Sequence, residues 1–194
     1  MFSKDSQKED LRVLRTRKML YEAFLELLSK KGFRSLTVGE ITDQAMVNRA
    51  TFYAHFADKY ALFEYAIREN FRQLLDAQIP DDCGYTTQNL QIVIAGVCDF
   101  LHQMNGLCHQ IDAQKLPPFD EQITGMVREI ITEWFQMDDD PKPGDPVLVA
   151  DIASWTIYGA ARHWSNYRQP ELAVAFAEQI TPMINWILIG IPVN

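Results

Sequence analysis

This 194-residue chain has only three cysteines, and their spacing matches no disulfide or metal-binding pattern. Cys83, Cys98 and Cys108 form an odd count without a CxxC pair, so neither a disulfide framework nor a zinc site of the usual spacing is expected. The chain also lacks a Gly-rich phosphate loop, a nucleophile elbow and a clear acid–base pair. We therefore expect no enzyme and no cofactor.

Long hydrophobic runs and a secretory leader are missing as well. The first ten residues, MFSKDSQKED, are polar and charged, and the longest charge-free stretch, residues 179–194, is too short to span a membrane and contains two prolines. No segment alternates in the manner of a β-strand, and no repeat is present. With 47% hydrophobic residues, these absences favour an all-α, cytoplasmic protein with a packed core and no membrane segment.

Charge is distributed unevenly along the chain. The net charge of −8 argues against a nucleic-acid partner, but residues 1–75 hold 13 of the 18 Lys and Arg residues against 10 acidic ones, a local balance of +3. A local positive face can bind phosphates on an acidic protein, because salt limits charge effects to about 10 Å. A merely solvated helix surface is the alternative.

Two short helical patterns separated by a tight turn follow in residues 37–59, TVGEITDQAMVNRATFYAHFADK. Thr37 and Glu40 form a capping box that opens the first, residues 46–48 form the turn, and Asn48 can cap the second. The second carries Arg49, Thr51, Tyr53 and His55. This is the layout of a helix-turn-helix, whose second helix enters the DNA major groove.

Apolar spacing predicts the remaining helices. One runs from Leu11 to a stop at Gly32, another from the cap Asp58 to about Ile79, and others over residues 87–104, up to about Phe135, 147–167 and 171–189. A further short helix is expected after Asn105. We expect a DNA-binding domain over residues 1–57 and an effector-binding and dimerisation domain over 58–194, with helix 58–79 as the connector.

The last two helices are apolar on nearly all sides, which a single small domain can hardly cover. Pairing of these helices with a second copy across a two-fold axis is the simplest arrangement, and a monomeric core is the alternative. The expected interface residues are Ala160, His163, Trp164, Phe176, Ile180, Ile184, Ile187 and Leu188.

The stretch TVGEITDQAMVNRATFYAHFADKYALF, residues 37–63, with the preceding Lys-Gly-Phe at 31–33, resembles the N-terminal domain of the TetR (tetracycline repressor) family of bacterial regulators. The resemblance covers about residues 12–75. It implies a homodimeric, ligand-responsive repressor whose two recognition helices dock about 34 Å apart on a near-palindromic operator. A helical small-molecule-binding or scaffolding dimer without DNA binding is the alternative.

The resemblance also implies roles for single residues. Phosphate or base contacts are expected from Thr37, Asn48, Arg49, Ala50, Thr51, Tyr53, His55 and Lys59, whereas Phe52 and Phe56 belong to the core. Arg49 can read guanine through two hydrogen bonds or contact only phosphate. Met46 occupies a turn position where family members often have Gly, and a left-handed backbone there is awkward for Met.

An unidentified small-molecule effector is expected in the larger domain. The candidate pocket residues, each of which plain core packing explains better when taken singly, are Leu101, Met104, Phe119, Val127, Ile131, Trp134, Phe135, Trp155 and Tyr158. The acidic excess of this domain favours either a cationic ligand or simple solvation. Cys98, His102, Cys108 and His109 are close in sequence and can bind metal or sense oxidants, or else serve as structural residues. We expect no metal.

Overall fold

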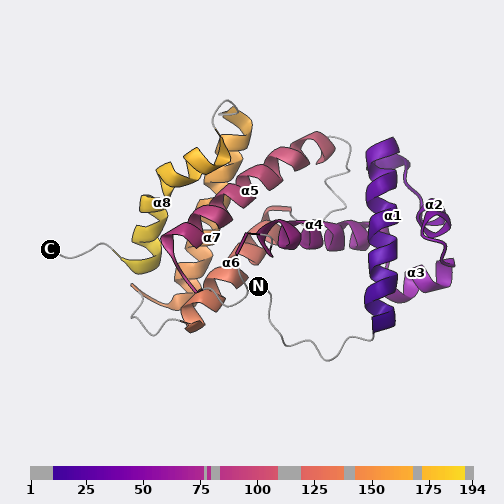
Figure 1. Cartoon of the computed structure of the whole chain (residues 1–194), viewed down its shortest axis with the longest axis horizontal. Coiled ribbons are helices and arrows are strands. Elements are labelled where there is room, and N and C mark those ends of the chain that lie inside the picture. The colour runs from indigo at the N-terminus through magenta and orange to yellow at the C-terminus, as the bar shows by residue number, and fades with distance from the viewer. Residues whose placement is uncertain are drawn as a thin grey trace. The chain divides into compact units, whose positions relative to one another are not determined.

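The structure is a computed structural model, and it describes residues 11–76, 78–79, 84–108, 119–137, 143–167 and 172–190. In these residues it has eight α-helices (Figure 1) and no strand, which confirms the expected all-α class. The helices are α1 (Leu11–Ser35), α2 (Val38–Gln44), α3 (Arg49–His55), α4 (Lys59–Asp76), α5 (Thr87–Cys108), α6 (Phe119–Met137), α7 (Pro146–Tyr167) and α8 (Ala173–Ile189).

The described chain divides into two compact units. The N-terminal unit contains residues 11–70, and the C-terminal unit contains the described residues of 71–106 and 119–190. The division therefore falls inside α4, after Asn70, whereas the sequence analysis placed the boundary before that helix. The functional assignment of the two parts stays a prediction.

An aromatic cluster forms the core of the N-terminal unit. Phe33 and Phe63 lie with ring centroids 5.1 Å apart, and Phe24 packs edge-on against both at 6.2 and 6.1 Å. All three are at most 2% exposed. Helices α1, α2 and α3 pack on one another (Figure 1). Burial of one such ring contributes about 2–3 kcal/mol, so the cluster fixes α4 against α1.

Gly32 interrupts α1 close to the predicted stop. Its φ of 71° and ψ of 161° break the helical backbone, and a short helical turn continues beyond it to Ser35. This conformation is essentially restricted to Gly, because a β-carbon would clash with the backbone. The break redirects the chain so that Phe33 enters the aromatic cluster.

In the C-terminal unit, α6 packs on α7 and α7 on α8. The contacts are supplied by fully buried aliphatic side chains such as Val127 and Ile131 of α6 and Ile157 of α7. Helix α5 extends to Cys108, so Asn105 is part of it rather than the start of a separate short helix. None of the described helices has the length and apolarity needed to cross a membrane.

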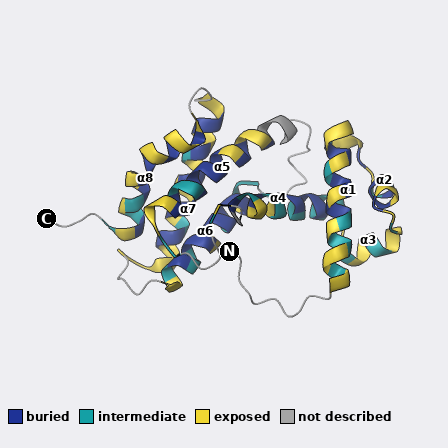
Figure 2. Ribbon diagram, in the orientation of Figure 1, coloured by how far each residue is buried: buried dark blue, intermediate teal, exposed yellow. Residues whose placement is uncertain are grey.

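Most residues of the predicted dimer interface are buried inside the protomer. Each protomer already buries five of them in its own core, so they offer no surface to a second copy: Trp164, Phe176, Ile180, Ile184 and Leu188 are at most 6% exposed. Ala160 and Ile187 are half-buried, and His163 is exposed. The exposed apolar residues of α7 and α8 lie on other faces of these helices (Figure 2).

Candidate nucleic-acid interface

The predicted capping box is present at the start of α2. The backbone N–H of Glu40 donates to Oγ1 of Thr37, and the Thr37 N–H and hydroxyl both donate to Oε2 of Glu40, each at 3.0 Å. Lys31 Nζ lies 2.5 Å from the other carboxylate oxygen. The hydrogen bonds from Lys31 and Thr37 lower the pKa of the Glu40 carboxyl to about 2.

This network alters the expected role of Thr37. Its hydroxyl is occupied by a carboxylate, and a negative group beside it disfavours a phosphate contact. Lys31, which lies on that carboxylate, is the cation at this helix end. We therefore regard Thr37 as the structural cap of α2, and its contact with phosphate stays a prediction.

Helix α3 has a capped start and one apolar face. Oδ1 of Asn48 accepts from the Thr51 N–H at 2.7 Å and from the Thr51 hydroxyl at 2.9 Å. Phe52 and Phe56 are 0% and 6% exposed, which confirms that they are core residues. Because the Asn48 oxygen is used for capping, only its amide N–H₂ group remains to meet a base edge.

The opposite face of α3 is open. Arg49, Ala50 and Tyr53 are exposed, and Thr51 and His55 are half-buried. The Tyr53 ring packs edge-on against Phe52 at 5.5 Å while the side chain stays 57% exposed. A helix presents only a few side chains to a groove, so this exposed set defines the candidate contact face. That these residues touch DNA stays a prediction.

The turn between α2 and α3 contains the unusual backbone foreseen at Met46. Its φ is 55°, and it is the only non-Gly residue with positive φ among the described residues. The Met46 N–H donates to the Asp43 carbonyl and the Val47 N–H to the Thr42 carbonyl, which closes the turn. The Met46 side chain is 86% exposed, so it gains little packing in return.

Lys59 occupies a structural position. Its Nζ donates to the carbonyls of Phe33, Arg34 and Leu36 at 3.1, 3.3 and 2.8 Å, and lies 4.7 Å from the Phe33 ring centroid. A cation suits the unpaired carbonyls that end a helix. These bonds use the donors that a phosphate would need. The structure does not support the expected phosphate contact of Lys59.

Of the four Cys and His residues that are close in sequence here, the structure describes the side chains of Cys98 and His102. Cys98 is fully buried, and burial, with a contribution from Asp99, raises the pKa of its thiol to about 12. His102 is exposed and its ring lies edge-on to Trp164. Within the described residues no three His, Cys, Asp or Glu side chains could hold a metal ion. His109 and the Cys108 side chain lie outside the description.

The predicted effector-pocket residues have mixed positions. Leu101, Met104, Val127, Ile131, Trp134 and Tyr158 are buried, Phe119 and Phe135 are half-buried, and Trp155 is 43% exposed. Burial fits core packing and pocket lining equally, so these residues stay candidates, but Trp155 faces outward and is removed from the set. A hollow of about 330 Å³ is found elsewhere in the same unit, between α5 and α8.

The capped α2, the turn and the half-exposed α3 together define a helix-turn-helix module. Residues 20–66 match the family described as "Bacterial regulatory proteins, tetR family". This segment, about a quarter of the chain, is therefore similar to the DNA-binding part of that family. The chain is also similar to the uncharacterised HTH-type transcriptional regulator YxbF of Bacillus subtilis, with 38% identity over 68 residues that cover 34% of this chain and 18% of that protein. The chain thus spans less than a fifth of this relative.

Solved structures resemble the chain over most of its length. The FadR regulator of Bacillus subtilis, solved in complex with stearoyl-CoA, aligns over 90% of this chain and 98% of its own with 19% identity and a TM-score of 0.52. The TetR family repressor AlkX of Dietzia sp. aligns over 87% and 95% with 18% identity and a TM-score of 0.56. At these identities the likeness establishes the fold of both units.

Proposed function

We propose that this protein is a homodimeric transcription regulator that binds operator DNA through α3 and is released by a small molecule. The observation that carries the proposal is the division of α3 into two faces. Phe52 and Phe56 pack into the core and fix the position of the helix. On the other face Arg49, Ala50 and Tyr53 are exposed to solvent, within the segment that matches the family model. A rigid helix with one anchored face is the form in which a major groove is read.

Charge supports DNA as the partner. The N-terminal 75 residues have a balance of +3, whereas the rest of the chain carries 5 basic and 16 acidic residues. The acidic part is repelled by phosphates, so only the N-terminal unit can approach the double helix. The same distribution fits a protein that binds DNA through its N-terminal unit.

Dimerisation uses an apolar stripe on α7 that the protomer leaves open. Leu148, Ile152 and Trp155 are 43–56% exposed and, with the exposed Gly159, recur at three- and four-residue spacings on one face. Met183 of α8 is 53% exposed. Such a stripe beside a small residue suits close pairing of two helices across a two-fold axis. Two copies are needed to place two copies of α3 on one operator.

The test is binding to DNA from the region upstream of the protein's own gene, measured by fluorescence anisotropy between about 50 and 300 mM salt. We expect nanomolar-range binding with a steep salt dependence, because several phosphates lose their counterions. Arg49→Ala should weaken binding to this DNA by roughly tenfold or more and binding to unrelated DNA much less. Arg128→Ala, which removes a cation from the C-terminal unit, is the control.

Equal losses on both DNAs would assign Arg49 to phosphate alone. A flat salt response, or absence of binding at about 50 mM salt, would contradict the regulator and leave a ligand-binding or scaffolding dimer.

A further inference from the structure

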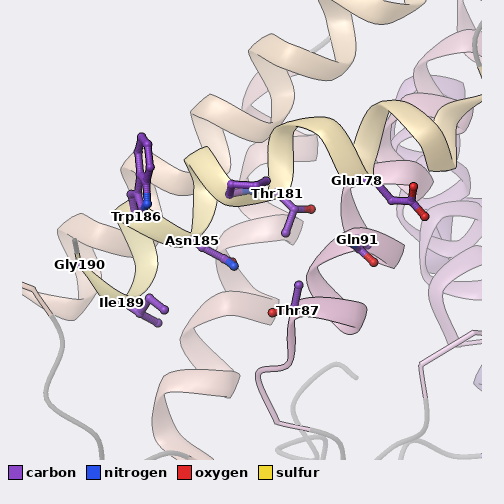
Figure 3. Close-up of a pocket in the computed structure, with 9 residues that line it drawn as sticks. Thr87, Gln91, Glu178, Thr181, Asn185, Trp186, Ile189 and Gly190 are labelled. Atoms are coloured by element: carbon purple, nitrogen blue, oxygen red, sulfur yellow. The ribbon is translucent and has the colours of Figure 1, made fainter. Parts of the chain in front are cut away.

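The hollow in the C-terminal unit is a groove between two helices. Thr87 and Gln91 of α5 form one side, and residues of α8 from Glu178 to Ile189, with Gly190 after the helix, form the other. Figure 3 shows Asn185 pointing toward the α5 side, whereas the Trp186 ring points away from it. Its volume of about 330 Å³ is at the lower end of what small-molecule sites have.

Oxygen acceptors collect at the end of the groove formed by Glu178. The Glu178 side chain is exposed, and Glu178 and Gln91 both line the groove. Four residues later Pro182 lies inside α8. Proline has no N–H, so the Glu178 carbonyl does not receive the usual helical hydrogen bond and remains an acceptor. Among the described residues that line the groove, none is Lys or Arg.

Asn185 is held in a defined orientation between the two helices. The Tyr85 hydroxyl donates to its Oδ1, and burial raises the pKa of Tyr85, which keeps this hydroxyl protonated. The amide nitrogen of Asn185 then points across the groove (Figure 3). This bond joins residues 100 positions apart and fixes the groove floor.

The other end of the groove is apolar. Trp186 is 55% exposed and Ile189 is 56% exposed, and both line it. Trp186 follows Glu178 by eight residues, which corresponds to about 12 Å along a helix. Trp186 and Glu178 therefore lie at opposite ends of an elongated site.

We propose that this groove binds an elongated organic cation, with its ammonium group on the Glu178 carboxylate and carbonyl and its apolar end on Trp186 and Ile189. The role of such a ligand as the effector rests on the proposed regulatory function, whereas its binding does not. An anionic ligand is disfavoured, because it would place its charge beside Glu178, and the described lining residues include no basic side chain.

The groove and the proposed dimer stripe use different flanks of α8. Glu178, Pro182 and Asn185 face α5, and Gln179 and Met183 are displaced by about 100° around the helix axis from Glu178 and Pro182. A second copy docked through α7 and Met183 therefore leaves the acceptor end of the groove open.

The experiment is calorimetric titration of the full-length dimer with three probes of one length: n-octylammonium, n-octanol and n-octanoate. We expect n-octylammonium to bind once per protomer and at least tenfold more tightly than n-octanol, with n-octanoate weakest. Glu178→Gln should lower the affinity for n-octylammonium roughly 5- to 10-fold and leave that for n-octanol unchanged. Trp186→Ala should weaken both. Glu121→Gln, an exposed carboxylate on α6, is the matched control.

Equal affinity for n-octanoate and n-octylammonium, an unchanged preference in Glu178→Gln, or no heat with any probe at millimolar concentration would overturn the proposal. A titration of the DNA complex separates the two hypotheses. If the protein binds n-octylammonium but no DNA, the proposed regulatory function is contradicted and the proposed ligand site is supported. If it binds the operator but not n-octylammonium, only the proposed ligand site is contradicted.

Discussion

The guanidinium group of Arg49 lies against Gly39, so close that a β-carbon at position 39 would stand 2.5 Å from Nη2 and 3.4 Å from Cζ of Arg49. Gly39 is a buried residue of α2, and Arg49 is the first residue of α3. Because Gly39 has no side chain, the side chain of Arg49, which we expect to contact bases, can pack against α2. The two helices of the module are coupled through this contact.

Gly39→Ala tests the coupling. The added methyl group displaces the Arg49 side chain, so we expect binding to the operator to weaken about fivefold, although Ala in place of Gly favours α2 itself by up to about 1 kcal/mol. In an Arg49→Ala background the same change should have no further effect. The measurement is a double-mutant cycle by fluorescence anisotropy. Additive losses would show that Gly39 acts independently of Arg49.

Lys59→Met tests the structural role of Lys59. Three backbone carbonyls lose a charged donor, so we expect the free energy of unfolding to fall by roughly 1–3 kcal/mol. The slope of log K against log salt should not change, whereas loss of a phosphate contact would reduce it by about 0.9. Lys30→Met, which breaks an exposed pair with Glu26, should leave the free energy of unfolding nearly unchanged. If Lys59→Met kept its full stability but reduced the slope of log K against log salt, a phosphate contact of Lys59 would be supported.

Capping and core positions of the helix-turn-helix could be predicted because they depend on neighbours a few residues away. Thr37 with Glu40, and Asn48 with Thr51, each complete their contacts within one helical turn. The same holds for Phe52, whose spacing places it on the inner face of α3. Contacts of this kind depend on residues within one helical turn, so short sequence patterns predict them.

The faces of α7 and α8 could not be predicted, because apolar residues surround both helices. Which of them enters the core depends on how α7 crosses α6 and α8. The structure buries Trp164 and Ile184 but leaves Trp155 and Met183 exposed, and no spacing rule separates these pairs. The contacts of Lys59 could not be predicted for a related reason, since its partners are carbonyls 23 to 26 positions away in the sequence.

Met46→Gly should stabilise the protein. A side chain at φ 55° costs about 1 kcal/mol, which Gly does not incur, so the free energy of unfolding in urea should rise by up to that amount. Met46→Ala is the control, because it removes the exposed side chain but keeps the β-carbon, and we expect no gain from it. Equal stabilisation by both substitutions would place the effect in the side chain rather than in the backbone.

Trp155→Glu tests the dimer face. A two-fold interface contains this residue twice, so a charge placed there should convert the dimer to a monomer at micromolar concentration in sedimentation experiments. Met137→Glu changes a residue of similar exposure, 50%, at the end of α6 and should leave the dimer intact. A dimer that survives Trp155→Glu would move the interface away from the α7 stripe.

The pKa of Glu40 links the stability of the module to acid. Its value of about 2 in the folded chain lies below the ordinary 4.5, chiefly because of the hydrogen bonds from Lys31 and Thr37, so folding favours the carboxylate form. The resulting stabilisation is complete above about pH 4.5 and disappears as the pH falls toward 2. Glu40→Gln should therefore be less stable than the parent at neutral pH, and urea unfolding at successive pH values should show the difference shrinking over this window.

Glu22→Gln, which removes a carboxylate 3.8 Å from Lys18, controls for the loss of one negative charge. A difference that stays constant down to about pH 2 would mean that the Glu40→Gln substitution disturbs packing or geometry at the cap, and that the charge of Glu40 contributes nothing.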